Sequence, residues 1–458
     1  MKTRLTPPYT PEEAAELAAE ALRDTLDAVR LTRRAGGLAL CRDVFGRLRG
    51  LGQWAAALPV DGNIGNGGDP AALLRTQRHR HLMIEGRAPG VCAEFDVASP
   101  CHSCRCGRLA WHLEGGPTMS HKTLLRTGPL LPGGASPYGP LGLQGAVGLT
   151  LPSGFTGRVV ARSGHKVAGL TWHAAPDGGA CFPDGDGWIY VSNSELPLLG
   201  GASALRFRAD GSIGDAYRIL SGTDLNRAGG ATPWHSWLSC ELGHRGRVFE
   251  CDPYGARAAR PRLAMGRFKH EAAACDPERG VVYMTEDEPD GCFYRFRPGD
   301  WGDLTEGTLE VLCSSGGWRV VPSPAALLQE TRHQVEDARH FDGGDGCHYA
   351  GGVCYFTTKS DTGLWAYDAQ TSTLDRLCEG VRAITAAPSG DLYVARETTQ
   401  IDVIAPDRAV TPFLRLEGHE GAELTGLAFS PRGDRLYFSA RRGRTEGHTF
   451  EVAGPFRG

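Results

Sequence analysis

The feature that most constrains the fold is a strand motif that recurs along the second part of the chain. Segments of alternating apolar and polar residues, such as "DGWIYVSNSE", "RGVVYMTEDEPDG" and "RGDRLYFSARRG", lie beside turns rich in Gly and Asp. Anchors for the six segments can be placed at Tyr190, Leu238, Tyr283, Tyr355, Tyr393 and Tyr437. The steps between them are 48, 45, 72, 38 and 44 residues. Most match the roughly 40–50 residues of a propeller blade, and the long step indicates an insertion between about Trp301 and Gln334.

We therefore predict an all-β fold, a six-bladed β-propeller over residues 151–458, preceded by a short helical and irregular N-terminal segment. The 63 glycines and 29 prolines agree with many short strands and tight turns. Radial repetition is also a way for an all-β chain of this length to avoid open sheet edges. A pair of β-sandwiches is the structural alternative.

The first 118 residues differ in character from the rest of the chain. Residues 1–40 are predicted to be helical, with Thr10 as the cap, Pro11 in the first turn and apolar residues at helical spacing. The stretch "KTRLTPPYTPEEAAELAAEALRDTL" is similar to the opening of a bacterial family of nucleotide-sugar glycosyltransferases. Residues 41–117 show no steady period. Residues 1–118 are either a fused fragment or gene-model artefact, or an irregular N-terminal domain, and 119–150 are expected to be a linker.

Charge and hydropathy exclude several classes of partner. The formal net charge of −4 disfavours general binding to nucleic acid or to an anionic membrane surface. No run approaches the 18 or so apolar residues that a membrane-spanning helix needs. The opening Met-Lys-Thr-Arg is not followed by an apolar stretch of the signal-peptide type. We expect a cytoplasmic monomer.

Acidic side chains at the ends of predicted strands are the first candidates for a functional site. The inner strands of a propeller converge on one channel, so single carboxylates from several blades can meet there and bind a hard cation such as Ca²⁺. Glu241 and Glu271 each follow a strand-like stretch, which favours a functional role, and Asn193 and Glu195 end another strand. Acids in Asp-Gly turns, such as Asp290, are interpreted as turn residues.

Longer motifs resemble the PhoX-type bacterial alkaline phosphatases. "LPSGFTGRVVARSG", "YRILSGTDLNRAGGATPWHSWLSCE", "MGRFKHEAAACDPERGVVYMTEDEPDGCFYRFRP" and "LTGLAFSPRGDRLYFSARRG" look like successive signatures of that family, over about residues 151–443. The resemblance implies a six-bladed propeller that hydrolyses phosphate monoesters. It also implies a calcium and ferric-iron cluster bound by carboxylates and one cysteine thiolate.

The resemblance assigns roles to individual residues. Glu271 matches a metal-binding glutamate, Glu241 the first acid of a Cys-Glu-Glu signature, and Asp345 a further metal ligand. Asn193 is the best candidate for a phosphate contact. The full prediction is a catalytic set of Asn193, Glu271 and Asp345, metal ligands Glu195, Glu241, Glu271, Asp345 and Glu423, and substrate or anion contacts Asn193, Arg227 and Arg267.

Departures from the family pattern weaken this prediction. Arg227 stands where the family has its cysteine ligand, Leu242 replaces a second glutamate, Gly343 an arginine and Arg382 an acidic or amide position. A cation at a former ligand position repels metals. Calcium remains expected, whereas losing the thiolate should weaken iron binding in particular.

Three functional hypotheses follow. The first is a metal-dependent phosphomonoesterase with reduced activity, acting on a small phosphorylated substrate. The second is a catalytically degenerate propeller that binds a ligand or a protein, with Arg227 holding an anion directly. The third is a propeller hydrolase of another class, such as a calcium-dependent lactonase.

Overall fold

The structure is a computed structural model that describes residues 130–133, 136–145 and 147–458. The predicted N-terminal helix, the glycosyltransferase-like stretch and the irregular segment up to residue 118 lie outside the described residues. The described residues form strands and two short 3₁₀ helices, η1 (Leu263–Met265) and η2 (Thr331–His333). None of the helices in this part of the chain has the length and apolar character to cross a bilayer.

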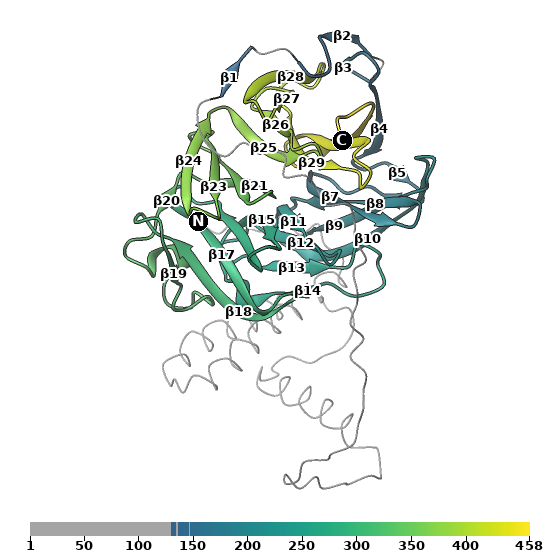
Figure 1. Cartoon of the computed structure of the whole chain (residues 1–458). Helices are drawn as coiled ribbons and strands as arrows, with labels where there is room; N and C mark the ends of the chain where they lie inside the picture. Colours follow the sequence, from purple (N-terminus) through teal and green to yellow (C-terminus); the bar gives the residue numbers. More distant parts are fainter. Residues whose placement is uncertain (1–129, 134–135, 146) are drawn as a thin grey trace, which may run out of the picture. The chain divides into compact units, whose positions relative to one another are not determined.

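Most of the strands form six blades around a central channel, each with a core of four antiparallel strands, so the prediction of a six-bladed β-propeller is confirmed (Figure 1). The short strands β5 (Lys166–Val167) and β6 (Leu170–Thr171) pair in a separate sheet. The blades are as follows: blade 1, β7 (Pro176–Asp184), β8 (Gly187–Ser194), β9 (Gly200–Phe207) and β10 (Ile213–Thr223); blade 2, β11 (Asn226–Ala231), β12 (Trp237–Glu241), β13 (Val248–Cys251) and β14 (Arg260–Pro261); blade 3, β15 (His270–Asp276), β16 (Val281–Glu286), β17 (Gly291–Asp300) and β18 (Asp303–Leu312); blade 4, β21 (Gly344–Ala350), β22 (Val353–Thr358), β23 (Leu364–Asp368) and β24 (Thr373–Cys378); blade 5, β25 (Val381–Ala386), β26 (Leu392–Arg396), β27 (Gln400–Ile404) and β28 (Ala409–Leu416); and blade 6, β29 (Glu423–Phe429), β30 (Arg435–Arg442), β31 (Glu446–Ala453) and β4 (Thr156–Arg162).

The six anchors of the sequence repeat all lie in the second strand of a blade, counted from the channel. All six side chains are fully buried, because second strands are covered by neighbouring blades on both faces. Tyr190 of blade 1 stacks on Tyr437 of blade 6, with ring centroids 4.8 Å apart. The repeat was visible in the sequence because these packing positions require large apolar side chains.

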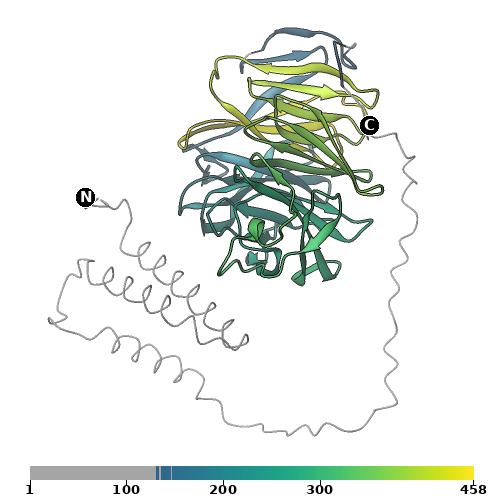
Figure 2. The ribbon, with the colours of Figure 1, turned by 90° about the vertical axis from the view of Figure 1, so that its left-hand side faces the viewer.

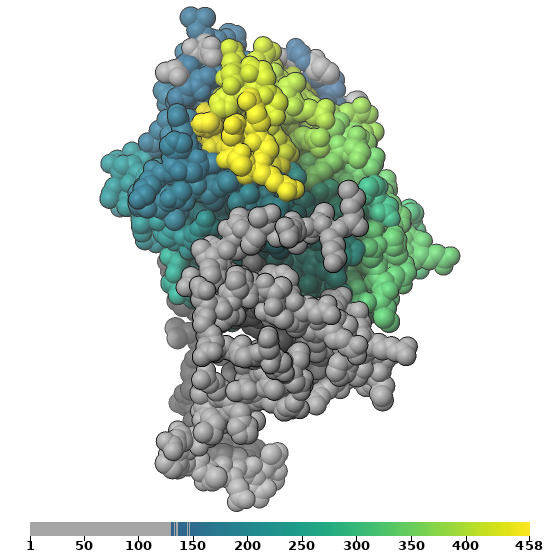
Figure 3. Space-filling model, turned by 180° about the vertical axis from the view of Figure 1, so that it is seen from behind, coloured from purple at the N-terminus to yellow at the C-terminus, as the bar shows by residue number. Residues whose placement is uncertain are grey.

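The propeller closes by pairing the two ends of its chain. β4 joins blade 6 as its outermost strand, antiparallel to β31 (Figures 2 and 3, blue beside yellow). A further three strands extend blade 5 at its outer edge, namely β1 (Leu131–Pro132), β2 (Leu141–Gln144) and β3 (Leu149–Pro152). Part of the segment 119–150, expected to be a linker, therefore belongs to a sheet and covers an edge that would otherwise be open.

The long step between anchors corresponds to extra structure on blade 3. The predicted insertion at about 301–334 includes β18, which is the regular fourth strand of the blade. The additional elements come later, as β19 (Trp318–Val320), η2 and β20 (His340–Phe341), and β20 pairs with β17. The spacing of the sequence repeat alone could not separate the fourth strand of the blade from the inserted segment.

A buried carboxylate fixes this insertion to the blade. Glu286, at the end of β16, accepts hydrogen bonds from the Tyr294 hydroxyl (2.8 Å) and the Cys292 backbone amide (3.1 Å). Arg332 of η2 donates to its other oxygen at 3.3 Å. Burial raises the pKa of Glu286 to about 7, although the Tyr294 hydroxyl and Arg332 oppose the shift.

Because its folded-state pKa is raised, Glu286 contributes stability below pH 4.5 that is lost as the pH rises through about 7. At about 1.4 kcal/mol per pKa unit, the loss is roughly 3 kcal/mol. We expect the unfolding free energy of Glu286→Gln, measured by urea denaturation, to rise relative to wild type by about that amount from pH 4.5 to 8. If the unfolding free energies of the two proteins changed in parallel with pH, the raised pKa of Glu286 would be contradicted.

Candidate functional site

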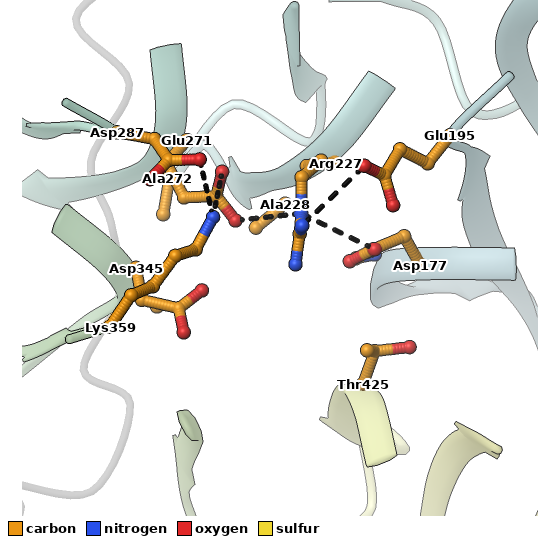
Figure 4. A network of polar contacts seen from close by, with 12 residues as sticks. Asp177, Glu195, Arg227, Ala228, Glu271, Ala272, Asp287, Asp345, Lys359 and Thr425 are labelled. Carbon is orange, nitrogen blue, oxygen red and sulfur yellow. Dashed lines mark hydrogen bonds and ion pairs between the residues drawn. The ribbon is translucent and has the colours of Figure 1, made fainter. Parts of the chain in front are cut away.

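A β-bulge near the start of each inner strand shapes the mouth of the channel. The pairing register shifts at corresponding places in β7, β11, β15, β21, β25 and β29. Bulges re-aim side chains, and here one residue per blade lies in or beside the bulge. We call these six residues the mouth ring: Asp177, Arg227, Glu271, Asp345, Arg382 and Thr425. Figure 4 shows five of them around one space, and Arg382 lies 3.9 Å from Asp345.

Small residues follow the mouth ring in every inner strand. They line a channel cavity of about 290 Å³ together with a few larger side chains, among them Trp237 and Phe429. The small residues are required because the inner strands approach each other closely. A Cβ at Gly178 would lie 2.4 Å from the Cα of Ala228, and one at Gly230 would lie 2.1 Å from the carbonyl oxygen of Ala273.

Arg227 is the centre of a buried ion-pair network at the mouth ring. Its guanidinium lies 3.1 Å from Glu271, 3.2 Å from Glu423, 3.4 Å from Glu195 and 3.7 Å from Asp177. These carboxylates come from blades 1, 3 and 6, and Arg227 itself comes from blade 2. The arginine therefore ties four of the six blades together at the channel mouth.

Two further cations complete the network. Arg441, at the end of β30, contacts Asp177 at 3.3 Å and also pairs with Glu195 and Glu423. The ammonium of Lys359, which follows β22, lies 3.2 Å from Glu271 and 2.6 Å from Asp287 (Figure 4). Every carboxylate that contacts Arg227 is thus shared with a second cation.

The pKa shifts follow from this crowding of buried charges. Burial alone would lower the pKa of Arg227, but the carboxylates of Glu271, Asp177 and Glu423 outweigh it and hold that pKa well above its usual value. Burial raises the pKa of Glu271 and of Glu423, although Arg227 opposes the shift in both. The guanidinium is therefore charged at any physiological pH.

Asn193 lies beside the network, where its side chain is fully buried. Its amide nitrogen donates to the carbonyl oxygens of Arg227 and Ala228, each at 2.9 Å. Its oxygen accepts hydrogen bonds from the Trp237 indole and the Ser239 hydroxyl, also at 2.9 Å. Asn193, which was predicted to contact phosphate, thus uses its side-chain amide to hold the backbone of the bulge at Arg227.

The other predicted site residues divide into two groups. Glu195, Glu271 and Glu423 meet at Arg227, and Asp345 shares the mouth ring with them. Glu241 and Arg267 do not join them. Glu241 accepts hydrogen bonds from the backbone amides of Asp224 and Arg247, and from the Arg247 guanidinium, all at 3.0 Å. Arg267 donates to the Arg245 carbonyl at 2.8 Å.

Several residues of the network were absent from the predicted site, namely Asp177, Asp287, Lys359, Arg382 and Arg441. One signal that could have found them is the polar residue before a pair of small ones, as in "DGGA", "RAGG" and "EAAA". The other is the charged residue that ends the second-strand motif, as in "YFTTK" and "YFSAR". Both signals recur once per blade in most blades and mark the same end of the channel.

The calcium and iron cluster that the resemblance implies does not fit these residues. The guanidiniums of Arg227 and Arg441 and the ammonium of Lys359 stand between the carboxylates that would bind the metals. In the part of the chain that the structure describes, no group of three or more His, Cys, Asp or Glu side chains is arranged to hold a metal ion. A metal would have to displace cations that already neutralise its ligands.

The comparisons with known proteins extend this picture. Residues 243–321, from blades 2 and 3 and including Glu271, match the family model described as alkaline phosphatase PhoX. The PhoX-type resemblance is confirmed. No curated protein matches the chain.

Two similar solved structures are described as gluconolactonases. One is a structural-genomics target assigned to that class, 14% identical, with a TM-score of 0.42 over 67% of this chain and 95% of its own. The other, from Xanthomonas campestris, is 15% identical, with a TM-score of 0.41 over 72% of this chain and 100% of its own. Such low identities and TM-scores carry no functional information.

Proposed function

We propose that this protein is a PhoX-like propeller that binds a small ligand at the channel mouth and does not carry out metal-assisted ester hydrolysis. The observation that supports the proposal is the contact of the Arg227 guanidinium with four carboxylates, at the position where the family has its thiolate ligand. The protein supplies the positive charge of the site from its own side chains.

The same contacts argue against the direct capture of a phosphate by Arg227. A phosphate would have to compete for the guanidinium with carboxylates that are already in place and mostly buried. Asn193, the other predicted contact, has its amide committed to backbone and side-chain partners. The site is thus poorly arranged for a phosphate monoester.

A calcium-dependent phosphomonoesterase is the second candidate. It is favoured by the family match over residues 243–321, and by the excess of carboxylates over cations around the mouth ring. A single Ca²⁺ bound at reduced affinity could use part of that excess, whereas iron would lack its thiolate.

Metal analysis and a phosphatase assay test the proposal together. We expect purified protein to hold far less than one equivalent of calcium or iron, and not to hydrolyse p-nitrophenyl phosphate with or without added CaCl₂. Near-stoichiometric calcium, with hydrolysis that Glu271→Ala abolishes, would replace the binding proposal by the phosphatase.

A variant that restores the family's cysteine should gain metal. In Arg227→Cys, the carboxylates of Glu271 and Glu423 lose their shared cation and the position regains a thiolate. We expect added Ca²⁺ or Fe³⁺ to raise the melting temperature of this variant and not that of wild type. Arg206→Cys is the control, since Arg206 pairs with Asp184 at 3.0 Å on the surface. An equal response in both variants would show that the thiol alone binds the metal.

A further inference from the structure

The mouth ring contains one carboxylate, that of Asp345, whose ion pair is long. The Oδ2 of Asp177 also accepts no hydrogen bond, but Asp177 has Arg441 at 3.3 Å. Asp345 is only 6% exposed, and its Oδ2 is buried and accepts no hydrogen bond. Its ion-pair partner is Arg382, at the long distance of 3.9 Å. By contrast, Glu271 has Arg227 at 3.1 Å and Lys359 at 3.2 Å. In Figure 4, the Asp345 carboxylate points toward the middle of the mouth ring, and Asp177 and Thr425 lie on the opposite side.

The charges around this space do not balance. Six carboxylates surround it, namely Asp177, Glu195, Glu271, Asp287, Asp345 and Glu423. Four cations accompany them, namely Arg227, Lys359, Arg382 and Arg441. An anionic ligand would add to the excess of negative charge, whereas a cation placed at Asp345 would reduce it.

The cavity next to the ring limits the size and polarity of a ligand. It measures about 290 Å³, at the small end of the range of ligand sites. Glycine and alanine provide much of its wall, and Trp237, Leu427 and Phe429 are among its larger apolar members. His348, Tyr349 and Thr385 are among its polar members. The apolar part of the wall suits a short alkyl group.

We propose that Asp345 binds the ammonium group of a small organic cation whose apolar part enters the channel. This proposal rests on the proposed function, because it requires a mouth ring without a metal cluster. The ammonium donates to the carboxylate of Asp345, and Thr425 lies opposite it on the mouth ring. The short alkyl part removes apolar channel surface from water.

A monovalent ammonium suits this place better than a divalent metal. Calcium requires six to eight oxygen ligands, whereas each of the other five carboxylates has a cation closer to it than the 3.9 Å between Arg382 and Asp345. Lys359 and Arg382 also lie near Asp345. An ammonium needs only two or three acceptors.

Butylammonium chloride is the probe that tests the proposal. It is compared with butanol, butyrate, inorganic phosphate and CaCl₂ by calorimetric titration and thermal shift of the full chain. We expect butylammonium alone to bind and to raise the melting temperature. Asp345→Asn should weaken that binding about tenfold or more, the usual value of a hydrogen bond to a charged group. Asp407→Asn, in an exposed turn of blade 5, should bind like wild type.

A second variant protects the test against misfolding of the first. Thr425→Lys leaves Asp345 in place but adds an ammonium to the mouth ring, and should abolish the response to butylammonium. Binding of butyrate or phosphate, equal binding of butanol, or no binding by any probe would overturn the ammonium proposal alone. Calcium binding accompanied by hydrolysis of p-nitrophenyl phosphate would overturn the proposed function as well.

Discussion

Replacing Arg227 by methionine is expected to lower the free energy of unfolding by about 3–5 kcal/mol at neutral pH. Methionine keeps much of the length of the side chain and removes the charge. Glu271 and Asp177, both almost fully buried, then lose a cation at 3.1 and 3.7 Å. Glu271 keeps Lys359 and Asp177 keeps Arg441. Water cannot replace the lost guanidinium at these buried carboxylates, so the loss exceeds that of a surface pair. Urea denaturation followed by tryptophan fluorescence measures it.

Arg206→Met is the matched control, because Arg206 also pairs with an aspartate at 3.0 Å but both side chains are about one-third exposed. It should cost about 1 kcal/mol or less. The decrease in the free energy of unfolding caused by Arg227→Met should also be smaller at pH 5 than at pH 8. Burial already raises the pKa of Glu271 and Glu423, and without Arg227 they bind protons more readily in the folded state. Equal losses in the two variants would show that the network does not stabilise the propeller.

The sequence was sufficient to predict the fold because one packing position repeats in every blade. The second strands need large buried side chains, such as Tyr190 and Tyr437, and these leave a visible period. The closure of the ring was less predictable. Residues 131–132 and 141–144 contain too few residues to show a strand period. The first pair joins blade 5 through β28, far along the chain, and the second joins it through the neighbouring β3, which itself pairs with β28.

The site was predictable in part, for a related reason. The motifs singled out Glu271 and Glu423, and the structure brings both to Arg227, because the bulged inner strands carry their own sequence pattern. No local pattern could reveal that Lys359 of blade 4 pairs with Glu271 of blade 3. The same holds for Arg441 of blade 6, which contacts Asp177 of blade 1. Nor could a local pattern show that the Glu241 carboxylate accepts hydrogen bonds from the backbone amides of Asp224 and Arg247. Whether a charged side chain is neutralised depends on partners that only the tertiary structure brings close to it.

Asn193→Ala is expected to lower the unfolding free energy by at least about 3 kcal/mol, since each buried polar group left without a partner costs about 1–3 kcal/mol. The variant leaves the Trp237 indole and the carbonyls of Arg227 and Ala228 without their partners. It also removes the hydrogen bonds that hold the bulge carrying Arg227. We therefore expect ligand affinity at the mouth ring to fall together with the free energy of unfolding. Gln329→Ala, at an exposed side chain with one hydrogen bond, should change stability little.

This variant separates two roles for Asn193 that the family resemblance alone could not distinguish. A residue that contacts phosphate lowers ligand affinity when it is removed and leaves the free protein about as stable as before. A residue that holds the Arg227 bulge lowers stability whether or not phosphate is present. The four hydrogen bonds of the buried Asn193 side chain support the second role. If unfolding of Asn193→Ala matched wild type while a response to inorganic phosphate was lost, Asn193 would be a phosphate contact, and the channel mouth would be an anion site after all.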